Sequence, residues 1–252
     1  MFNLKKRSWR HKFRLVWFLL VTVFMFWQCF GHQAKGITPE MRSSNDQVHV
    51  AVTDEMIRFS PSNPTSVEIL FFPGGMVDPG SYIPLSRDLA IAGYHVSIIK
   101  MPWRLSTNEY LKTKEMFDLN DPTKQYLLAG HSQEAEMAAQ FVYEHPDLID
   151  GLILLGTSHP RDFSMADIRI PSLKIYVEND GLASPREVFD NEIHLPEGSE
   201  IAKIKGGNHS QFGSMGRLLM DGKSTISRKE QQQKTADLMI EFMTQFEATD
   251  YE

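Results

Sequence analysis

Residues 126–134 read YLLAGHSQE, and this stretch decides the fold class. The short apolar segment 126–129 runs through Gly130 and Ser132 into a helical pattern over 134–144. A strand that passes into a helix through Gly-x-Ser forces the serine into a sharp turn and leaves its hydroxyl above the sheet. Gly130 favours that turn because it lacks a Cβ and lets the strand and helix approach. A serine that merely caps a helix gives the same pattern, so this segment alone leaves two interpretations open.

The alternation of strand and helix continues on both sides of this turn. Apolar segments predict strands at 67–72, 95–100, 126–129, 152–155, 173–177 and 201–204. Capping signals predict helices that begin after Asp78, Ser184 and Ser227, and the polar residues 104–120 are also expected to be helical. Strands separated by helices imply crossover connections. The expected fold is therefore α/β, a doubly wound, mostly parallel sheet flanked by helices. It forms one domain over residues 37–252, and the short link 157–171 leaves room for a minimal lid or none.

Charge and cysteine content exclude several functions. Residues 1–36 hold seven of the 26 basic residues and no acid, so the remaining 19 basic residues face 32 acidic ones, a formal charge of −13. A body this acidic repels phosphate backbones, and nucleic acid is not an expected partner. Cys29 is the only cysteine. The body therefore has no disulfide and no thiol nucleophile, and neither a metal site nor a cofactor is predicted.

The first 36 residues have the pattern of an export segment. Basic residues up to Arg14 precede the apolar run 15–27. A run of about 13 to 16 apolar residues fits a signal peptide, whereas a membrane span needs roughly 20. Cleavage after Gly31 or Gly36 is one interpretation, and an uncleaved membrane anchor is the other. Both place the body outside the cytoplasm, secreted or held at a membrane.

A serine nucleophile needs a base, and the order of the strands selects one histidine. His209 lies just beyond the last predicted strand, in 205–213 (KGGNHSQFG), with glycines on both sides. Catalytic groups collect at the carboxyl edge of open α/β sheets, where this loop would present an imidazole. His209 is therefore the predicted base. His159, which follows the strand at 152–155, is the main rival.

The acid and the oxyanion donors follow from the same topology. Asp180 and Glu178 both follow the penultimate strand, and Asp180 is the favoured partner of the histidine. The backbone N–H of Gln133, directly after the serine, is the first predicted oxyanion donor. The second is the N–H of Met76 or Gly75, because two glycines after strand 67–72 let the backbone approach a substrate.

These segments, taken in order, resemble the α/β-hydrolase superfamily, and specifically its alpha/beta hydrolase fold-5 branch. The matching segments are Phe71-Phe-Pro-Gly-Gly75, Asp78-Pro79, Gly93-Tyr94, Lys100-Met-Pro102, Gly130-His-Ser132, His145-Pro-Asp147, Asp180-Gly181, Gly206-Gly-Asn-His209, Gln211-Phe-Gly213 and Thr225-Ile-Ser-Arg228. The resemblance implies Ser132 as nucleophile, Asp180 as acid and His209 as base. The expected activity is that of an exported serine hydrolase, a carboxylesterase-like enzyme acting on a small-molecule ester or related acyl substrate.

One departure from the resemblance favours a second hypothesis. Residues 133–135 read Gln-Glu-Ala where relatives usually have Leu-Gly-Gly. Glu134 either swings outward, or crowds the turn and brings a carboxylate near the oxyanion. In the second case the protein is a weakly active or non-catalytic binding protein with the hydrolase fold, tethered to a membrane if the N-terminal segment stays uncleaved.

Overall fold

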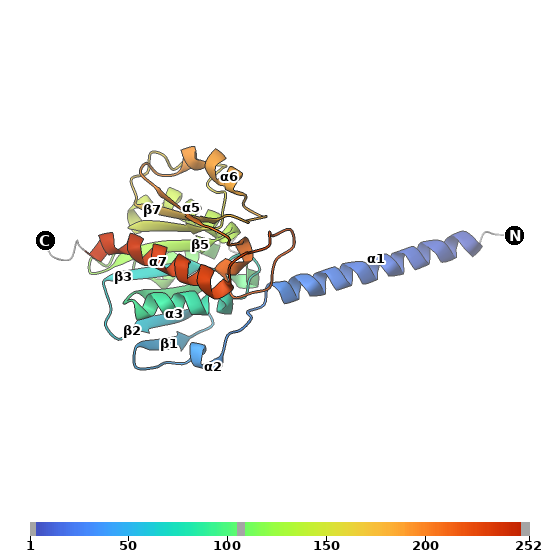
Figure 1. Ribbon diagram of the computed structural model, residues 1–252, viewed down its shortest axis with the longest axis horizontal. Helices are drawn as coiled ribbons and strands as arrows, with labels where there is room; N and C mark the ends of the chain where they lie inside the picture. The colour runs from blue at the N-terminus through green and yellow to red at the C-terminus, as the bar shows by residue number, and fades with distance from the viewer. Residues whose placement is uncertain (1–3, 105–108, 248–252) are drawn as a thin grey trace.

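The computed structural model describes residues 4–104 and 109–247. These residues form one eight-stranded sheet in the order β1-β2-β4-β3-β5-β6-β7-β8, with helices on both faces (Figure 1). The strands are β1 (Val48–Val52), β2 (Met56–Pro61), β3 (Val67–Phe72), β4 (His95–Ile99), β5 (Gln125–His131), β6 (Gly151–Leu155), β7 (Ser172–Val177) and β8 (Glu200–Ile204). From β4 to β8 neighbouring strands are parallel, which confirms the predicted doubly wound, mostly parallel sheet.

The helices are α1 (Leu4–Gly31), α2 (Pro39–Arg42), α3 (Ile83–Ile91), α4 (Thr113–Met116), α5 (Gln133–Glu144), α6 (Pro185–Asp190) and α7 (Arg228–Glu247). Three of the helices, α3, α6 and α7, follow the capping signals predicted at Asp78, Ser184 and Ser227. Asp78 accepts the N–H of Gly80 at 2.8 Å, at the start of a 3₁₀ turn, Pro79–Tyr82, that leads into α3. Ser184 and Glu187 form the predicted capping box at α6. Ser227 Oγ accepts the N–H of Glu230 at the start of α7.

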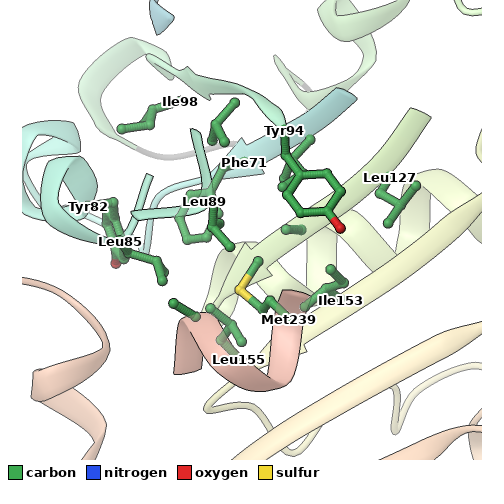
Figure 2. Close-up of a cluster of buried hydrophobic side chains, with 14 of the residues drawn as sticks. Phe71, Tyr82, Leu85, Leu89, Tyr94, Ile98, Leu127, Ile153, Leu155 and Met239 are labelled. Atoms are coloured by element: carbon green, nitrogen blue, oxygen red, sulfur yellow. The ribbon is translucent and has the colours of Figure 1, made fainter. Parts of the chain in front are cut away.

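The central strand β3 lies between two hydrophobic cores, one on each face of the sheet. All six residues of β3 are buried. Phe71 points to the face covered by α3 and α7, where it packs with Leu89 and Met239 (Figure 2). Phe72 points to the other face and packs with Phe141 of α5. Burial on both faces explains why this strand reads as a continuous apolar run instead of an alternating one.

Two parts of the chain differ from what the sequence predicted. Residues 104–120 were expected to be helical, but their described part holds the end of one 3₁₀ turn (Pro102–Arg104), a second 3₁₀ turn (Glu109–Lys112) and the one-turn helix α4. Its buried side chains, among them Tyr110 and Leu119, do not recur at the spacing of a longer helix. The antiparallel pairing of β1 with β2 and of β2 with β4 at one edge of the sheet was not predicted.

The connection between β6 and β7 carries no lid. Residues 156–171 form turns and irregular backbone with no helix. This segment is too short to cover the sheet edge, as expected from its length. The carboxyl ends of β3, β5, β6, β7 and β8 lie at one edge of the sheet, and the loops after these strands build the site described below.

Helix α1 stands apart from the body (Figure 1). Its apolar side chains, such as Trp17 and Phe18, are exposed, so it is not a core helix. The transmembrane interpretation of this segment is not supported, because no helix among the described residues is both long and apolar enough to span a bilayer. The apolar run 15–27 falls short of the roughly 20 residues that a span requires.

Candidate active site

Ser132 sits at the turn between β5 and α5 in a strained backbone conformation. Its φ is 59° and its ψ is −127°, a region that non-glycine residues rarely adopt and that costs about 1–3 kcal/mol. The Ser132 N–H donates to the carbonyl of Leu155 on β6 at 2.9 Å, which holds the turn in place. A Cβ on Gly130 would lie 2.6 Å from the Cα of Ala135, so only glycine permits this approach of strand and helix.

His209 and Asp180 meet in the interior. Nδ1 of His209 lies 3.0 Å from Oδ2 of Asp180, and the two side chains are 1% and 0% exposed. A carboxylate accepts only, so Nδ1 carries the proton. Oδ1 of Asp180 accepts the N–H groups of Leu182 and Ala183 at 2.8 and 2.7 Å. The alternative acid, Glu178, is exposed and bonds to Lys203 and to the N–H of Gly206 instead.

Ser132 and His209 line one small cup at the carboxyl edge of the sheet, with a volume of about 290 Å³. Nε2 of His209 is buried and has no hydrogen-bond partner among the described residues. Because Nδ1 is bonded to Asp180, the lone pair of Nε2 is the atom that remains to accept a proton. Ser132 and His209 therefore share the cup, and Asp180 contacts His209 from outside its lining.

Asp221 is a site residue that the sequence did not reveal. It is buried, and its Oδ1 accepts the N–H groups of His209 and Gly181 at 3.2 and 3.3 Å. Its Oδ2 accepts the N–H of Ser210 at 2.8 Å and the Ser210 hydroxyl at 2.5 Å. One carboxylate therefore ties the loop of the histidine to the loop of its acid. Asp221-Gly222 has the composition of a surface turn, and nothing local indicated that Asp221 would be buried.

The N–H of Gly75 is the open donor in the loop after β3. The N–H of Met76 already donates to the carbonyl of Arg104 at 2.6 Å. The N–H groups of Gly75 and Gln133 have no acceptor among the described residues. A Cβ on Gly75 would lie 3.7 Å from the Cβ of Gln133, so the two backbones are neighbours. Of the two alternatives predicted for the second oxyanion donor, the geometry favours Gly75 over Met76.

Tyr82 and His131 connect this loop to the turn at Ser132. The Tyr82 hydroxyl accepts the N–H of Gly74 at 2.9 Å and lies 2.7 Å from Nδ1 of His131. Burial, and next the charge of His209, hold the pKa of His131 well below its usual range, so His131 is neutral and its Nδ1 accepts from Tyr82. Burial raises the pKa of the Tyr82 phenol, which keeps its proton. Neither residue was singled out from the sequence, because their contact joins positions 49 residues apart.

Glu134 points inward. It is 1% exposed, which excludes the outward orientation considered from the sequence. A Cβ on Gly75 would lie 3.6 Å from Oε1 of Glu134, so this carboxyl group lies beside the loop after β3. The turn at Ser132 tolerates the side chain without losing its backbone geometry. The remaining question is electrostatic, because a negative charge here opposes a developing oxyanion.

His159, the rival base, has a different partner. It also lines the cup, but its Nε2 lies 3.1 Å from Oε2 of Glu136. Burial, and next the charge of Arg161, lower the pKa of His159 to about 4. Among the described residues, Glu136, His159 and Asp162 have ligand atoms within 4.8 Å of one another, the spacing of a metal site. Arg161 lies 3.5 Å from Asp162 and already neutralises it.

Comparison with known proteins assigns the family. Residues 68–233, about two thirds of the chain, match the model of the alpha/beta hydrolase family. The chain therefore belongs to the alpha/beta hydrolase family, as the sequence resemblance predicted. A search among curated proteins returned no match.

Solved structures share the fold at low sequence identity. TT1662 from Thermus thermophilus has a TM-score of 0.59 at 12% identity, covering 79% of this chain and 98% of its own. The monoacylglycerol lipase of Paleococcus ferrophilus has a TM-score of 0.55 at 14% identity, covering 78% and 99%. Est1E from Butyrivibrio proteoclasticus has a TM-score of 0.55 at 12% identity, covering 79% and 100%. These similarities show the fold, and the chemistry has to be argued from the site.

Proposed function

We propose that this alpha/beta hydrolase cleaves carboxylic esters through Ser132. The observation that carries the proposal is the shared cup: Ser132, in its strained turn, opens onto the same small space as His209. His209 is held by Asp180 through Nδ1 and leaves Nε2 open. A serine, a base oriented by an acid, and two open backbone donors are the parts that acyl transfer requires.

The proposed reaction has two balanced steps. Ser132 Oγ attacks the ester carbonyl while His209 Nε2 takes its proton, and Asp180 stabilises the imidazolium. The oxyanion receives the N–H groups of Gln133 and Gly75. The bond to the alcohol then breaks, His209 returns the proton to the leaving oxygen, and an acyl-enzyme remains. Water then attacks the acyl-enzyme carbonyl while His209 Nε2 takes its proton. The bond to Ser132 Oγ breaks, Oγ regains the proton from His209, and the carboxylic acid leaves.

The cup favours a small and polar substrate. With about 290 Å³ and no lid, it lies just below the range of about 300 to 1,000 Å³ that is usual for small-molecule pockets. Most of its wall is polar, namely Gln133, Glu136, Thr157, Ser158, His159 and Arg161. A long apolar acyl chain would find little apolar surface to cover here. Short acyl groups on a polar alcohol are therefore the proposed substrates, in contrast to the fold relative from Paleococcus ferrophilus, which is a monoacylglycerol lipase.

The experiment is covalent labelling of the purified full-length chain with a fluorophosphonate probe, in a non-ionic detergent because α1 is apolar. Wild type and His159→Gln should be labelled, whereas Ser132→Ala and His209→Ala should not. Hydrolysis of p-nitrophenyl acetate should follow the same pattern and exceed that of p-nitrophenyl octanoate. Absence of labelling and of hydrolysis in wild type contradicts the proposal.

A non-catalytic binding protein is the second candidate, and Glu134 is the observation that favours it. A buried carboxyl beside Gly75 opposes the charge of an oxyanion. In that case wild type stays unlabelled, but the cup still binds a neutral ester analogue without turnover. Labelling that depends on Ser132 excludes this candidate.

We further infer that the body works outside the cytoplasm after export. The basic and apolar composition of 1–30 supports export.

Contacts at the base of α1 favour cleavage after Gly31 over cleavage after Gly36. The carbonyl of His32 accepts the N–H of Asp78 at 2.8 Å, and the carbonyl of Ser214 accepts the N–H of Lys35 at 2.7 Å. Cleavage after Gly36 would remove both bonds. Cell fractionation with N-terminal sequencing tests this, and a full-length chain recovered from the soluble cytoplasm contradicts it.

A further inference from the structure

A second hollow, here called the basic hollow, shares no residue with the cup. Its volume is about 360 Å³, within the range of small-molecule pockets. The end of α2, the edge strands β1 and β2, the loop after β3 and the segment after β4 all contribute to it. Nothing in the proposed reaction uses this space.

The wall of the basic hollow is apolar. Ile57 and Ile83 are buried at its base, and Val50 is half-buried beside them. Val52 also lines the hollow and is 61% exposed, although it belongs to a sheet whose other large apolar side chains are mostly buried. Apolar surface that stays in contact with water inside a concave site gains free energy when an apolar group covers it.

The rim of the hollow is cationic. Arg42, Lys100 and Arg104 line it, and Asp78 is the one carboxylate among its described lining residues, which leaves a formal charge of +2. Arg104 pairs with Asp78 at 3.4 Å. Lys100 donates to the carbonyl of Thr53, a neutral partner. Neither Lys100 nor Arg42 has a carboxylate partner among the described residues, although Asp54 and Glu55 line a neighbouring hollow that Lys100 also touches.

This positive rim contrasts with the body as a whole, residues 37–252, which carries a formal charge of −13. Arg42 and Lys100 lie beside an apolar wall and have no carboxylate partner among the described residues. Together they offer a local site for an anion with an apolar tail. Guanidinium and ammonium groups are the donors that bind carboxylates most strongly, and two of them reach the same rim.

We propose that the basic hollow binds a single-chain amphiphile with a carboxylate head, such as a medium-chain fatty acid. The carboxylate lies against Arg42 and Lys100, and the aliphatic chain covers Val52 and Ile57. The site stands on its own, because its residues take no part in the proposed ester hydrolysis. It borders the loop of Gly75 through Asp78 and Arg104, whose carbonyl accepts the N–H of Met76.

The test is a titration of octanoate, labelled with ¹³C at the carboxyl carbon, with the full-length chain in one non-ionic detergent throughout. The carboxyl chemical shift reports the dissociation constant. Wild type should bind octanoate at least tenfold more tightly than acetate, which lacks the tail. The double variant Arg42→Gln, Lys100→Gln should lose at least tenfold in affinity. Val52→Glu, on an exposed position of an edge strand, should lose as much because it puts a carboxylate on the apolar wall.

Arg161→Gln is the matched control, since Arg161 lines the cup and not the basic hollow. It should leave the octanoate affinity unchanged. Thermal melting checks that each variant is folded. Equal affinity of wild type and the double variant, equal affinity for octanoate and acetate, or a loss confined to Arg161→Gln each overturns the proposal. None of these outcomes depends on whether Ser132 reacts with a fluorophosphonate.

Discussion

The two loops that flank Ser132 are built in opposite ways. The loop of His209 is here called the base loop (205–213). Asp221 accepts hydrogen bonds from the N–H groups of His209 and Ser210, and Asp180 accepts one from Nδ1 of His209. In the loop after β3, here called the donor loop (73–78), the N–H of Gly75 has no acceptor among the described residues, and Met76 is 48% exposed. The base loop gains orientation from internal bonds, whereas the donor loop keeps a donor open for a ligand. A base has to be held in one orientation, whereas an oxyanion donor has to stay free for the substrate, so the two loops need different local structures.

The largest effect is expected from removing the anchor of the base loop. Asp221→Asn keeps the size of the side chain but replaces one acceptor oxygen by an NH₂ group that faces N–H donors. We expect kcat for a short ester to fall about a hundredfold with little change in KM, because His209 shifts while the cup keeps its lining. Steady-state kinetics measures this.

Asp190→Asn on the exposed end of α6 is the matched control and should change neither constant. A rise in KM without loss of kcat would mean that Asp221 does not position the base.

A third segment of the cup, the loop after β6 that carries His159, is expected to lose stability at acid pH. Because the folded-state pKa of His159 is about 4 and its usual value is 6.5, the unfolded chain takes up the proton first as the pH falls. The stability that the neutral imidazole provides is complete above about pH 6.5 and is lost as the pH falls through 4, on the order of 2 kcal/mol. Urea unfolding at pH 7 and pH 4 measures the loss.

His159→Gln should lose less stability than wild type over this range, and His145→Gln, at a half-buried histidine outside the cup, should behave as wild type. If His159→Gln shows the same pH slope as wild type, the titration of His159 has no part in acid sensitivity.

Breaking the support of the donor loop should cost less than breaking that of the base loop. Tyr82→Phe removes the hydroxyl that joins Gly74 to His131. We expect kcat to fall roughly tenfold, because the donor of Gly75 is displaced rather than lost. Tyr143→Phe, at an exposed position of α5, serves as control. A loss as large as that of Asp221→Asn would erase the distinction between the two loops.

The smallest effect is expected from Glu134, and it has the opposite sign. Glu134→Gln keeps the shape of the side chain beside Gly75 and removes its charge. We expect kcat to rise roughly three- to fivefold, because a nearby negative charge no longer opposes the oxyanion. Glu241→Gln on the surface of α7 should have no effect. A fall in kcat for Glu134→Gln would show that the carboxylate supports the turn instead of hindering it.

Much of this molecule follows from local sequence patterns. The apolar run of β3 marks a central strand, the cap at Ser184 marks the start of α6, and Gly-x-Ser marks the turn between β5 and α5. The choice of Asp180 and His209 also came from the sequence, since each follows a strand whose carboxyl end must open at the same edge. The structure brings these two side chains into contact at 3.0 Å. Their catalytic role stays a prediction until Ser132 is labelled.

Other features were decided by the tertiary structure alone. The inward orientation of Glu134, the bonds of Asp221 to the base loop and the bridge from Gly74 through Tyr82 to His131 all join segments far apart in the chain. Periodicity and capping report which face of an element is buried, because they repeat within a few residues. They carry no information on which buried polar groups find each other. The sequence by itself therefore determined the order of elements and the residues brought to one edge, and packing decided which N–H groups are held and which stay open.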